Sequence, residues 1–221
     1  EVNEVIFNPF PHGSLQLHAR YRLGKYLRDE KYDQAIVLPN SLKSALVPFL
    51  ARIPLRTGFV GEMRYGLLND ARKLDKRKLP LMVERFAQLA ELAGDDIPRP
   101  LPNPVLKVSQ TDCDATLYKL GLTLDKPVAV FCPGAEYGPA KRWPVSYFAE
   151  IAQRLQQHGF EVWLLGSAKD KDTAEKIVSL GNQACRNLCG GTGLGDAIAL
   201  LSCAQLVISN DSGLMHLAAA L

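Results

Sequence analysis

The stretch that decides the fold is Val128-Ala-Val-Phe-Cys-Pro-Gly-Ala-Glu-Tyr-Gly-Pro-Ala-Lys-Arg-Trp-Pro144. The same order of features occurs again in Leu206-Val-Ile-Ser-Asn-Asp-Ser-Gly-Leu-Met-His216. Each begins with a short apolar run that predicts a buried strand, and each continues through a polar loop into a helical pattern. In open α/β sheets, ligands collect at the carboxyl ends of strands, where helix N-termini present unpaired N–H groups. The two loops are therefore the candidate site.

Strands alternate with helices along the rest of the chain as well. Helical periodicity predicts helices at 15–27, 45–52, 81–92, 112–120, 144–155, 170–180 and 196–203, and apolar runs predict further strands at 5–7, 33–38, 56–59, 160–165 and 185–188. This alternation predicts an α/β fold with parallel, doubly wound sheets.

A proline-rich connection divides the chain. Residues 97–104 contain four prolines, which exclude a helix or a central strand and favour a stiff extended segment. We therefore predict two domains, 1–107 and 108–221.

Composition and charge narrow the function classes. With 47% hydrophobic and 22% charged residues, the chain has an ordinary globular composition. No apolar run approaches the ~18 residues that span a bilayer, and no signal peptide opens the sequence, so we expect a cytoplasmic protein without a transmembrane segment. The five cysteines lack C-x-x-C spacing and are expected to be buried small side chains, with no metal site.

The two predicted domains differ in charge. Residues 1–107 carry 17 Lys/Arg against 12 Asp/Glu, a net charge of +5, whereas residues 108–221 carry 9 against 11, a net charge of −2. The basic half could face an anionic partner, or its charges could form a solubilising surface. We do not expect a nucleic acid to be that partner.

Lys141 lies in a loop punctuated by glycine and proline, just before a predicted helix N-terminus. Its ammonium and the free N–H groups of that helix can converge on one anion, which suits a phosphate or a diphosphate. A solvent-exposed lysine beside Arg142 is the alternative. The second loop favours the anion site.

In that second loop, Asp211, Ser212 and Gly213 follow a predicted strand and open a helix. Asp211 could cap this helix. Ser212 and Gly213 can also offer backbone N–H groups to a phosphate, and Gly213 allows its close approach. His216 lies one turn further on, either packed against the core or within reach of the helix mouth.

Two other patterns are set aside. Gly191-Thr-Gly-Leu-Gly195 is similar to part of a dinucleotide fingerprint, but Asp196 stands at its sixth position, so a turn and a helix start explain it better. Asp211, Ser212 and His216 are the residue types of a hydrolase triad, yet they crowd into six positions and lack a Gly-x-Ser-x-Gly elbow.

The motifs together resemble a known family. Residues 133–144 and 210–216 look like the two donor-site motifs of the ADP-heptose:lipopolysaccharide heptosyltransferases, and residues 38–48 and 56–70 are similar to the heptosyltransferase II branch of that family. The resemblance covers almost the whole chain. It implies glycosyltransferase family 9 and a GT-B fold with two Rossmann-like domains, both incomplete here: 1–107 on the acceptor side and 108–221 binding the ADP-sugar.

The resemblance also implies a reaction. Such an enzyme transfers L-glycero-D-manno-heptose from ADP-heptose, with inversion and without metal or other cofactor, to the first heptose of the lipopolysaccharide inner core. Its acceptor, heptosyl-Kdo2-lipid A, would bring it to the cytoplasmic face of the inner membrane as a peripheral protein. Two alternatives stay open: a nucleotide-binding α/β module without catalysis, and a GT-B transferase that uses another sugar nucleotide.

Site residues follow from the same resemblance. Lys141 matches the family's lysine that contacts the donor phosphates and stabilises the departing ADP. The other donor-binding positions are Gly134, Ala135, Glu136, Tyr137, Asp211, Ser212, Gly213 and His216. Lys43, Arg64 and the basic run at 72–78 are our candidates for contact with the acceptor's phosphates and acidic sugars, because of the charge of the first half.

The chain departs from the family pattern at two places. Some heptosyltransferases have a Glu near the adenosine, where this chain has Gly-Ser-Ala-Lys at 166–169. The segment with the family's catalytic Asp would precede the first residue. We therefore expect an internal fragment that lacks both ends and is inactive by itself.

Overall fold

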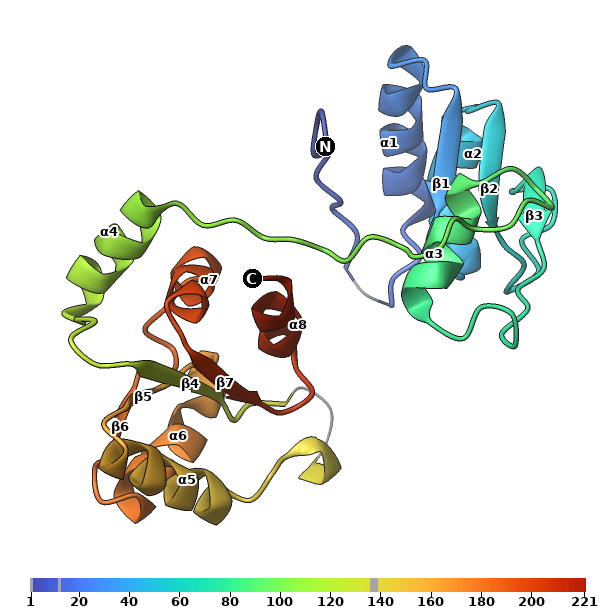
Figure 1. The fold of residues 1–221 in the computed structure, drawn as a ribbon. Coiled ribbons are helices and arrows are strands. Elements are labelled where there is room, and N and C mark those ends of the chain that lie inside the picture. The colour runs from blue at the N-terminus through green and yellow to red at the C-terminus, as the bar shows by residue number, and fades with distance from the viewer. Residues whose placement is uncertain (1, 12, 136–138) are drawn as a thin grey trace. The chain divides into compact units, whose positions relative to one another are not determined.

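A computed structural model describes residues 2–11, 13–135 and 139–221. The chain forms two compact units, Glu1–Pro102 and Asn103–Leu221, each built on a parallel sheet (Figure 1). The division falls inside the proline-rich connection, a few residues before 107. Residues 103–107 go with the second unit because the N–H of Leu106 donates to the carbonyl of Ala220 at 2.7 Å.

The first unit, unit 1, is a small sheet with helices around it. Its described elements are α1 (Leu17–Asp29), β1 (Gln34–Val37), α2 (Leu42–Leu50), β2 (Leu55–Phe59), β3 (Asp70–Arg72) and α3 (Met82–Ala90). The strands lie in the order β1-β2-β3 and are parallel, as the alternation of elements predicts.

Two details of unit 1 differ from the prediction. The strand expected at 5–7 does not form: Val5 and Phe7 are 87% and 82% exposed, and no described strand pairs with them. Strand β3 was not predicted because Asp-Ala-Arg contains no apolar run. It exists because it pairs with β2, and the ion pair between Asp70 and Arg72, at 2.7 Å, holds its two charged side chains together.

The second unit, unit 2, has a larger sheet. Its described elements are α4 (Gln110–Leu120), β4 (Val128–Cys132), the 3-10 helix η1 (Pro139–Lys141), α5 (Val145–Gln157), β5 (Glu161–Leu164), the 3-10 helix η2 (Ala168–Asp170), α6 (Lys171–Leu180), β6 (Cys185–Asn187), α7 (Leu194–Ser202), β7 (Leu206–Ser209) and α8 (Gly213–Ala220). The predicted helices and strands of this half are confirmed, with ends that differ by one or two residues.

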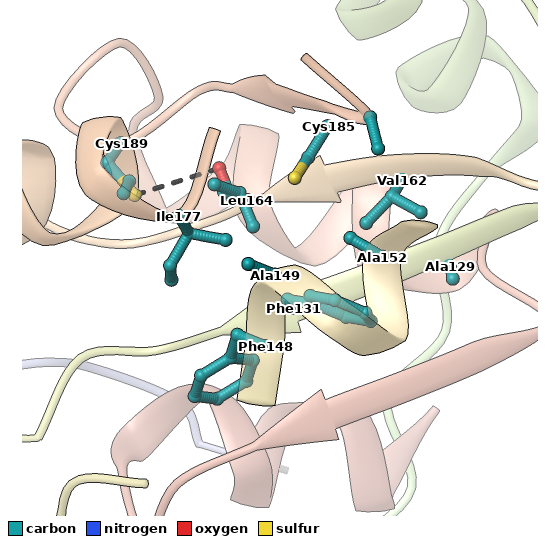
Figure 2. Close-up of a cluster of buried hydrophobic side chains, with 12 residues drawn as sticks. Ala129, Phe131, Phe148, Ala149, Ala152, Val162, Leu164, Ile177, Cys185 and Cys189 are labelled. Atoms are coloured by element: carbon teal, nitrogen blue, oxygen red, sulfur yellow. Dashed lines mark hydrogen bonds between the residues drawn. The ribbon is translucent and has the colours of Figure 1, made fainter. Parts of the chain in front are cut away.

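Helices cover both faces of the unit 2 sheet. All five side chains of β4 are buried. Helices α5 and α6 pack on one face, where the rings of Phe131 and Phe148 lie 5.7 Å apart (Figure 2). Helices α4, α7 and α8 pack on the other face around Leu200 and Trp163 (Figure 1). The cysteines are free thiols, and four of the five are buried, as expected.

The strand order β6-β5-β4-β7 places β4 and β7 side by side. The chain leaves β4 toward β5 on one side and returns to β7 on the other, so the connections diverge at the carboxyl end of β4. Residue Cys132 is level with Ser209 in the register of the two strands. Both candidate loops therefore begin at the same height, at the point where an open sheet of this kind binds ligands.

Candidate functional site

A cavity of about 570 Å³ opens at the carboxyl ends of the unit 2 strands. Gly134, Ala135 and Arg142 line it from the loop after β4, and Ser212 and Gly213 line it from the loop after β7. The two loops that the sequence singled out thus share one cavity. Its volume lies in the range of small-molecule and cofactor sites.

At the edge of this cavity, the ammonium of Lys141 donates to the carboxylate of Asp211 at 2.5 Å. Both side chains are about half exposed, at 46% and 57%. The hydrogen bond and the charge of Lys141 lower the pKa of Asp211, and the nearby charge of His216 lowers it further. Lys141 does not itself line the cavity, but its partner directly precedes Ser212, which does.

Helix α8 starts at this point. Ser212 is its N-cap, with extended backbone angles of φ −146° and ψ 170°, and its hydroxyl does not cap the helix. That hydroxyl instead lies 3.3 Å from the hydroxyl of Ser209. Asp211 therefore precedes the cap and pairs with Lys141, so the first N–H groups of α8 are not taken by either side chain. His216 is exposed one turn along the helix.

Asn210 joins the two loops; it lies in the motif at 210–216 but was not among the predicted site residues. Its side chain is buried, at 7% exposure. The amide Nδ2 donates to the carbonyl of Pro133 at 2.7 Å, and Oδ1 accepts from the N–H of Trp143 at 3.1 Å. One side chain thereby contacts the beginning and the end of the loop that follows β4.

Gly134 is required by close packing. A Cβ at this position would lie 2.7 Å from the carboxyl group of Asp170, too close for any side chain. The Asp170 carboxylate is itself held in place by the N–H and the hydroxyl of Ser167, at 2.9 and 2.7 Å. A side chain at position 134 would therefore push the Asp170 carboxylate out of these hydrogen bonds.

The far end of the same loop is anchored by an aromatic cluster. The Trp143 ring meets Phe148 edge-on at 5.1 Å and lies 5.5 Å from Tyr147. Because Phe148 is buried in the core of unit 2, this contact ties the loop to α5. Such aromatic pairs contribute about 0.5–1.5 kcal/mol beyond the area that they bury.

A third segment lines the cavity although its motif was set aside. Thr192, Gly193 and Leu194, at the start of α7, form part of the wall. Asp196 accepts from the N–H of Gly193 at 2.8 Å and from Lys119 at 2.8 Å. The segment is a turn and a helix start, as expected, but the fold brings it to the site because β6 ends at the same edge of the sheet.

The cavity floor includes Cys132, whose thiol is fully buried. Burial raises the pKa of Cys132 to about 12, with a further contribution from Cys189. The thiolate is the nucleophilic form of cysteine. Cys132 is therefore a structural side chain at neutral pH and not a candidate nucleophile.

The remaining predicted site residues differ in where they lie. Gly134 and Ala135 line the cavity, whereas Glu136 and Tyr137 lie outside the described residues. Lys43 is half-buried at the beginning of α2.

The expected contact of Arg64 with the acceptor does not agree with its burial, because its side chain is only 1% exposed. Its guanidinium donates to the carbonyls of Phe59, Pro39 and Ser41 and to the side chains of Asn40 and Ser44. The structure thus uses Arg64 to join the loops after β1 and β2. In this arrangement its donors point at the protein and not at solvent.

Among residues 2–11, 13–135 and 139–221, no group of three or more His, Cys, Asp or Glu side chains is arranged to hold a metal ion. None of the helices in these ranges is both long enough and apolar enough to cross a membrane.

Comparison with known proteins places the chain in a family. The model of glycosyltransferase family 9 (heptosyltransferase) matches residues 20–221. Lipopolysaccharide heptosyltransferase 2 of Escherichia coli is 51% identical over 230 aligned residues, and that of Salmonella typhimurium is 50% identical. Each alignment covers 100% of this chain and 66% of the relative. The chain therefore spans just under two thirds of the length of these proteins.

Solved structures agree with that placement. ADP-heptose lipopolysaccharide heptosyltransferase II of E. coli superposes with a TM-score of 0.86 at 48% identity, covering 93% of this chain and 65% of that one. A family 9 glycosyltransferase of Veillonella parvula shares the fold at 20% identity, with a TM-score of 0.81. The predicted α/β fold of the GT-B type is confirmed, and the chain belongs to glycosyltransferase family 9.

Proposed function

We propose that this member of glycosyltransferase family 9 transfers L-glycero-D-manno-heptose from ADP-heptose to the first heptose of the lipopolysaccharide inner core. The 51% identity to the E. coli protein named lipopolysaccharide heptosyltransferase 2 extends over the whole chain and supports this assignment. The observation that carries it is the meeting of Lys141 with the N-terminus of α8 beside one cavity.

The donor's pyrophosphate belongs between these two features. The Lys141 ammonium and the N–H groups of Ser212 and Gly213 are positive partners for its oxygens. Gly134 and Gly213 keep the backbone near the ligand without a side chain in the way.

The adenosine then lies deeper in the cavity. Leu165, Leu194 and Leu217 supply apolar lining there. Apolar walls with a few polar groups at the mouth are typical of nucleotide pockets.

In this function Lys141 acts on the leaving group. As the bond between the heptose and ADP breaks, negative charge grows on the β-phosphate, and a fixed ammonium with fixed N–H dipoles stabilises it. Asp211 holds the Lys141 ammonium in place before the donor binds. We propose an inverting transfer in which these groups do the work that a metal ion does in other transferases.

The acceptor belongs to unit 1. Lys43, at the start of α2, remains our candidate for contact with an acceptor phosphate, whereas Arg64 shapes the loop that presents it. The acceptor heptosyl-Kdo2-lipid A would be met at the cytoplasmic face of the inner membrane, with no part of the described chain inserted.

A transfer assay tests the proposal. The complete reading frame that contains this chain is incubated with heptosyl-Kdo2-lipid A and either ADP-heptose or UDP-sugars, and the product is followed by mass spectrometry. We expect one heptose to be added from ADP-heptose only. Lys141→Ala should lower kcat, while Lys126→Ala, an exposed lysine at the amino end of β4, should not.

Three results would change the assignment. Transfer from a UDP-sugar would make it a transferase with another donor. Tight ADP binding without any transfer would make it a binding module. Unchanged kcat in Lys141→Ala would remove the leaving-group role from that residue.

A further inference from the structure

The loop after β4 carries the candidate phosphate contacts, and its described residues form little regular structure. Between the end of β4 and the start of α5, the described residues contain only the single turn η1. A loop of this kind needs outside contacts to hold an ammonium at a defined position. Besides the aromatic cluster at Trp143, the contacts come from two consecutive residues after β7, Asn210 and Asp211.

We propose that Asn210 is a positioning residue that closes this loop at both ends and thereby sets Lys141 against the donor pyrophosphate. The inference rests on the proposed function for the identity of the ligand. Asn210 contacts Pro133 and Trp143, which flank the loop, and the next residue contacts Lys141 within it. Three points of the loop are thus fixed by one short segment of the neighbouring strand end.

The Asn210 amide satisfies both contacts with one planar group. Pro133 offers a carbonyl and needs a donor, whereas Trp143 offers an N–H and needs an acceptor. Asparagine carries both groups on one planar fork. Aspartate has the same shape but no donor, so an oxygen of its carboxylate would face the Pro133 carbonyl. Because the site is buried, an unmatched group there cannot turn to water.

A second amide at the opposite edge of the same strand pair provides a matched control. The side chain of Gln205 accepts from the N–H of Val128, where β4 and β7 begin. It also joins a side-chain amide to the backbone of the neighbouring strand, but it lies at the amino ends, away from the cavity. Gln205→Ala therefore removes a similar cross-strand contact without touching the loop.

The experiment measures ADP binding to the 221-residue chain by calorimetry for the wild type, Asn210→Ala, Asn210→Asp and Gln205→Ala. We expect both Asn210 variants to bind ADP about tenfold more weakly, the size of one lost charged or buried hydrogen bond, and Gln205→Ala to bind as the wild type does. Thermal unfolding of each variant is recorded beside it. Asn210→Asp keeps the side-chain volume and serves if Asn210→Ala does not fold.

A positioning role also predicts coupling. In a Lys141→Ala background, Asn210→Ala should cost less than about twofold in ADP affinity, because the group that it positions is gone. Equal losses in both backgrounds would overturn the proposal. So would a loss of affinity in Gln205→Ala that equals the loss in Asn210→Ala.

A measurement without ligand separates this inference from the proposed function. The chain has two tryptophans, of which Trp163 is fully buried and Trp143 is 39% exposed, so acrylamide quenching reports on Trp143. Quenching should rise in the Asn210 variants and not in Gln205→Ala. If the complete reading frame fails to bind ADP, the proposed function is wrong, and unchanged Trp143 quenching would refute the positioning role independently.

Discussion

In unit 2 all five side chains of β4 are buried between two layers of helices, whereas in unit 1 Val37 is the one residue of β1 that is buried. Unit 2 is held by apolar packing on both faces of its sheet. Unit 1 has two small apolar clusters, around Leu89 and around Ala45. The two units therefore reach a parallel sheet by different means.

Arginine side chains take over part of the stabilisation in unit 1. Those that donate to backbone carbonyls are Arg20, Arg28, Arg56, Arg64, Arg72 and Arg85. Two of them, Arg20 and Arg64, are buried. Hydrogen bonds from charged donors contribute more than neutral ones, about 1.5–3 kcal/mol each.

This difference bears on the net charge of +5 in the first half of the sequence. A surplus of basic residues suggests a surface for an anionic partner, but several of these charges serve to join loops. The lesson is that charge counted along a chain overestimates the charge that a partner can meet. Lys43 and the basic run at 72–78 remain candidates for contact with an anionic partner. Arg72 is the exception within that run, because it pairs with Asp70.

The largest expected effect is that of Arg64→Ala. It removes a buried guanidinium together with the donors for the buried carbonyl of Phe59 and the part-buried carbonyls of Pro39 and Ser41. We expect a loss of about 4 kcal/mol in the free energy of unfolding. Hydrogen exchange of unit 1 peptides in urea measures this loss in the free energy of unfolding. Both tryptophans lie in unit 2, so their fluorescence midpoint should stay in place. Arg22→Ala, at an exposed position on α1, is the control.

Leu200→Ala is the reciprocal test in unit 2. Leu200 is fully buried between α7 and the sheet. Removal of a buried leucine side chain costs about 3 kcal/mol. The urea midpoint of tryptophan fluorescence should fall while exchange in unit 1 peptides is unchanged. Equal shifts of both probes in either variant would show that the units do not unfold separately.

A smaller effect is expected on ADP affinity, which should depend on unit 2 and not on unit 1. We expect Lys141→Ala to weaken ADP binding by about 2 kcal/mol, the contribution of a charged hydrogen bond, and Lys43→Ala in unit 1 to leave the Kd unchanged. Titration calorimetry at two salt concentrations measures both. A matching loss in Lys43→Ala would mean that unit 1 also contacts the nucleotide.

The smallest effect concerns a helix start that occurs in both units, in which an acidic side chain of the first turn accepts from the N–H of the N-cap residue. Asp196 of α7 accepts hydrogen bonds from Lys119 and from the N–H of Gly193, and both lower its pKa. Glu84 of α3 likewise accepts from the N–H of Leu81 and from Arg99, and both lower its pKa. Asp196→Asn should cost about 1 kcal/mol at pH 7.

The pH dependence of that cost has a defined sign. A folded pKa below the ordinary value of 3.8 means that the contribution is complete above about pH 4 and is lost as the pH falls through the folded pKa. Wild type and Asp196→Asn should therefore differ in urea midpoint at pH 7 and converge as the pH falls below the folded pKa of Asp196. A constant difference would rule out the carboxylate as the cause.

Local patterns were sufficient to predict most of unit 2. Strands β4 and β7 are mainly apolar runs. Each is followed by a loop whose glycines and polar residues predict a ligand site. The helices repeat apolar residues at the spacing of one buried face. The strand expected at 5–7 was wrong because a β pattern forms a strand only where a neighbour pairs with it.

The sequence by itself determined the alternation of strands and helices, the two loops at strand ends, and the family. Those features depend on residues that are close together in the chain. Only the tertiary structure decided that Arg64 is buried, that 192–194 line the cavity, and that Asn210 closes a loop whose ends lie 77 and 67 residues away. Burial and hydrogen-bond partners of this kind depend on which strands become neighbours, and no local pattern contains that information.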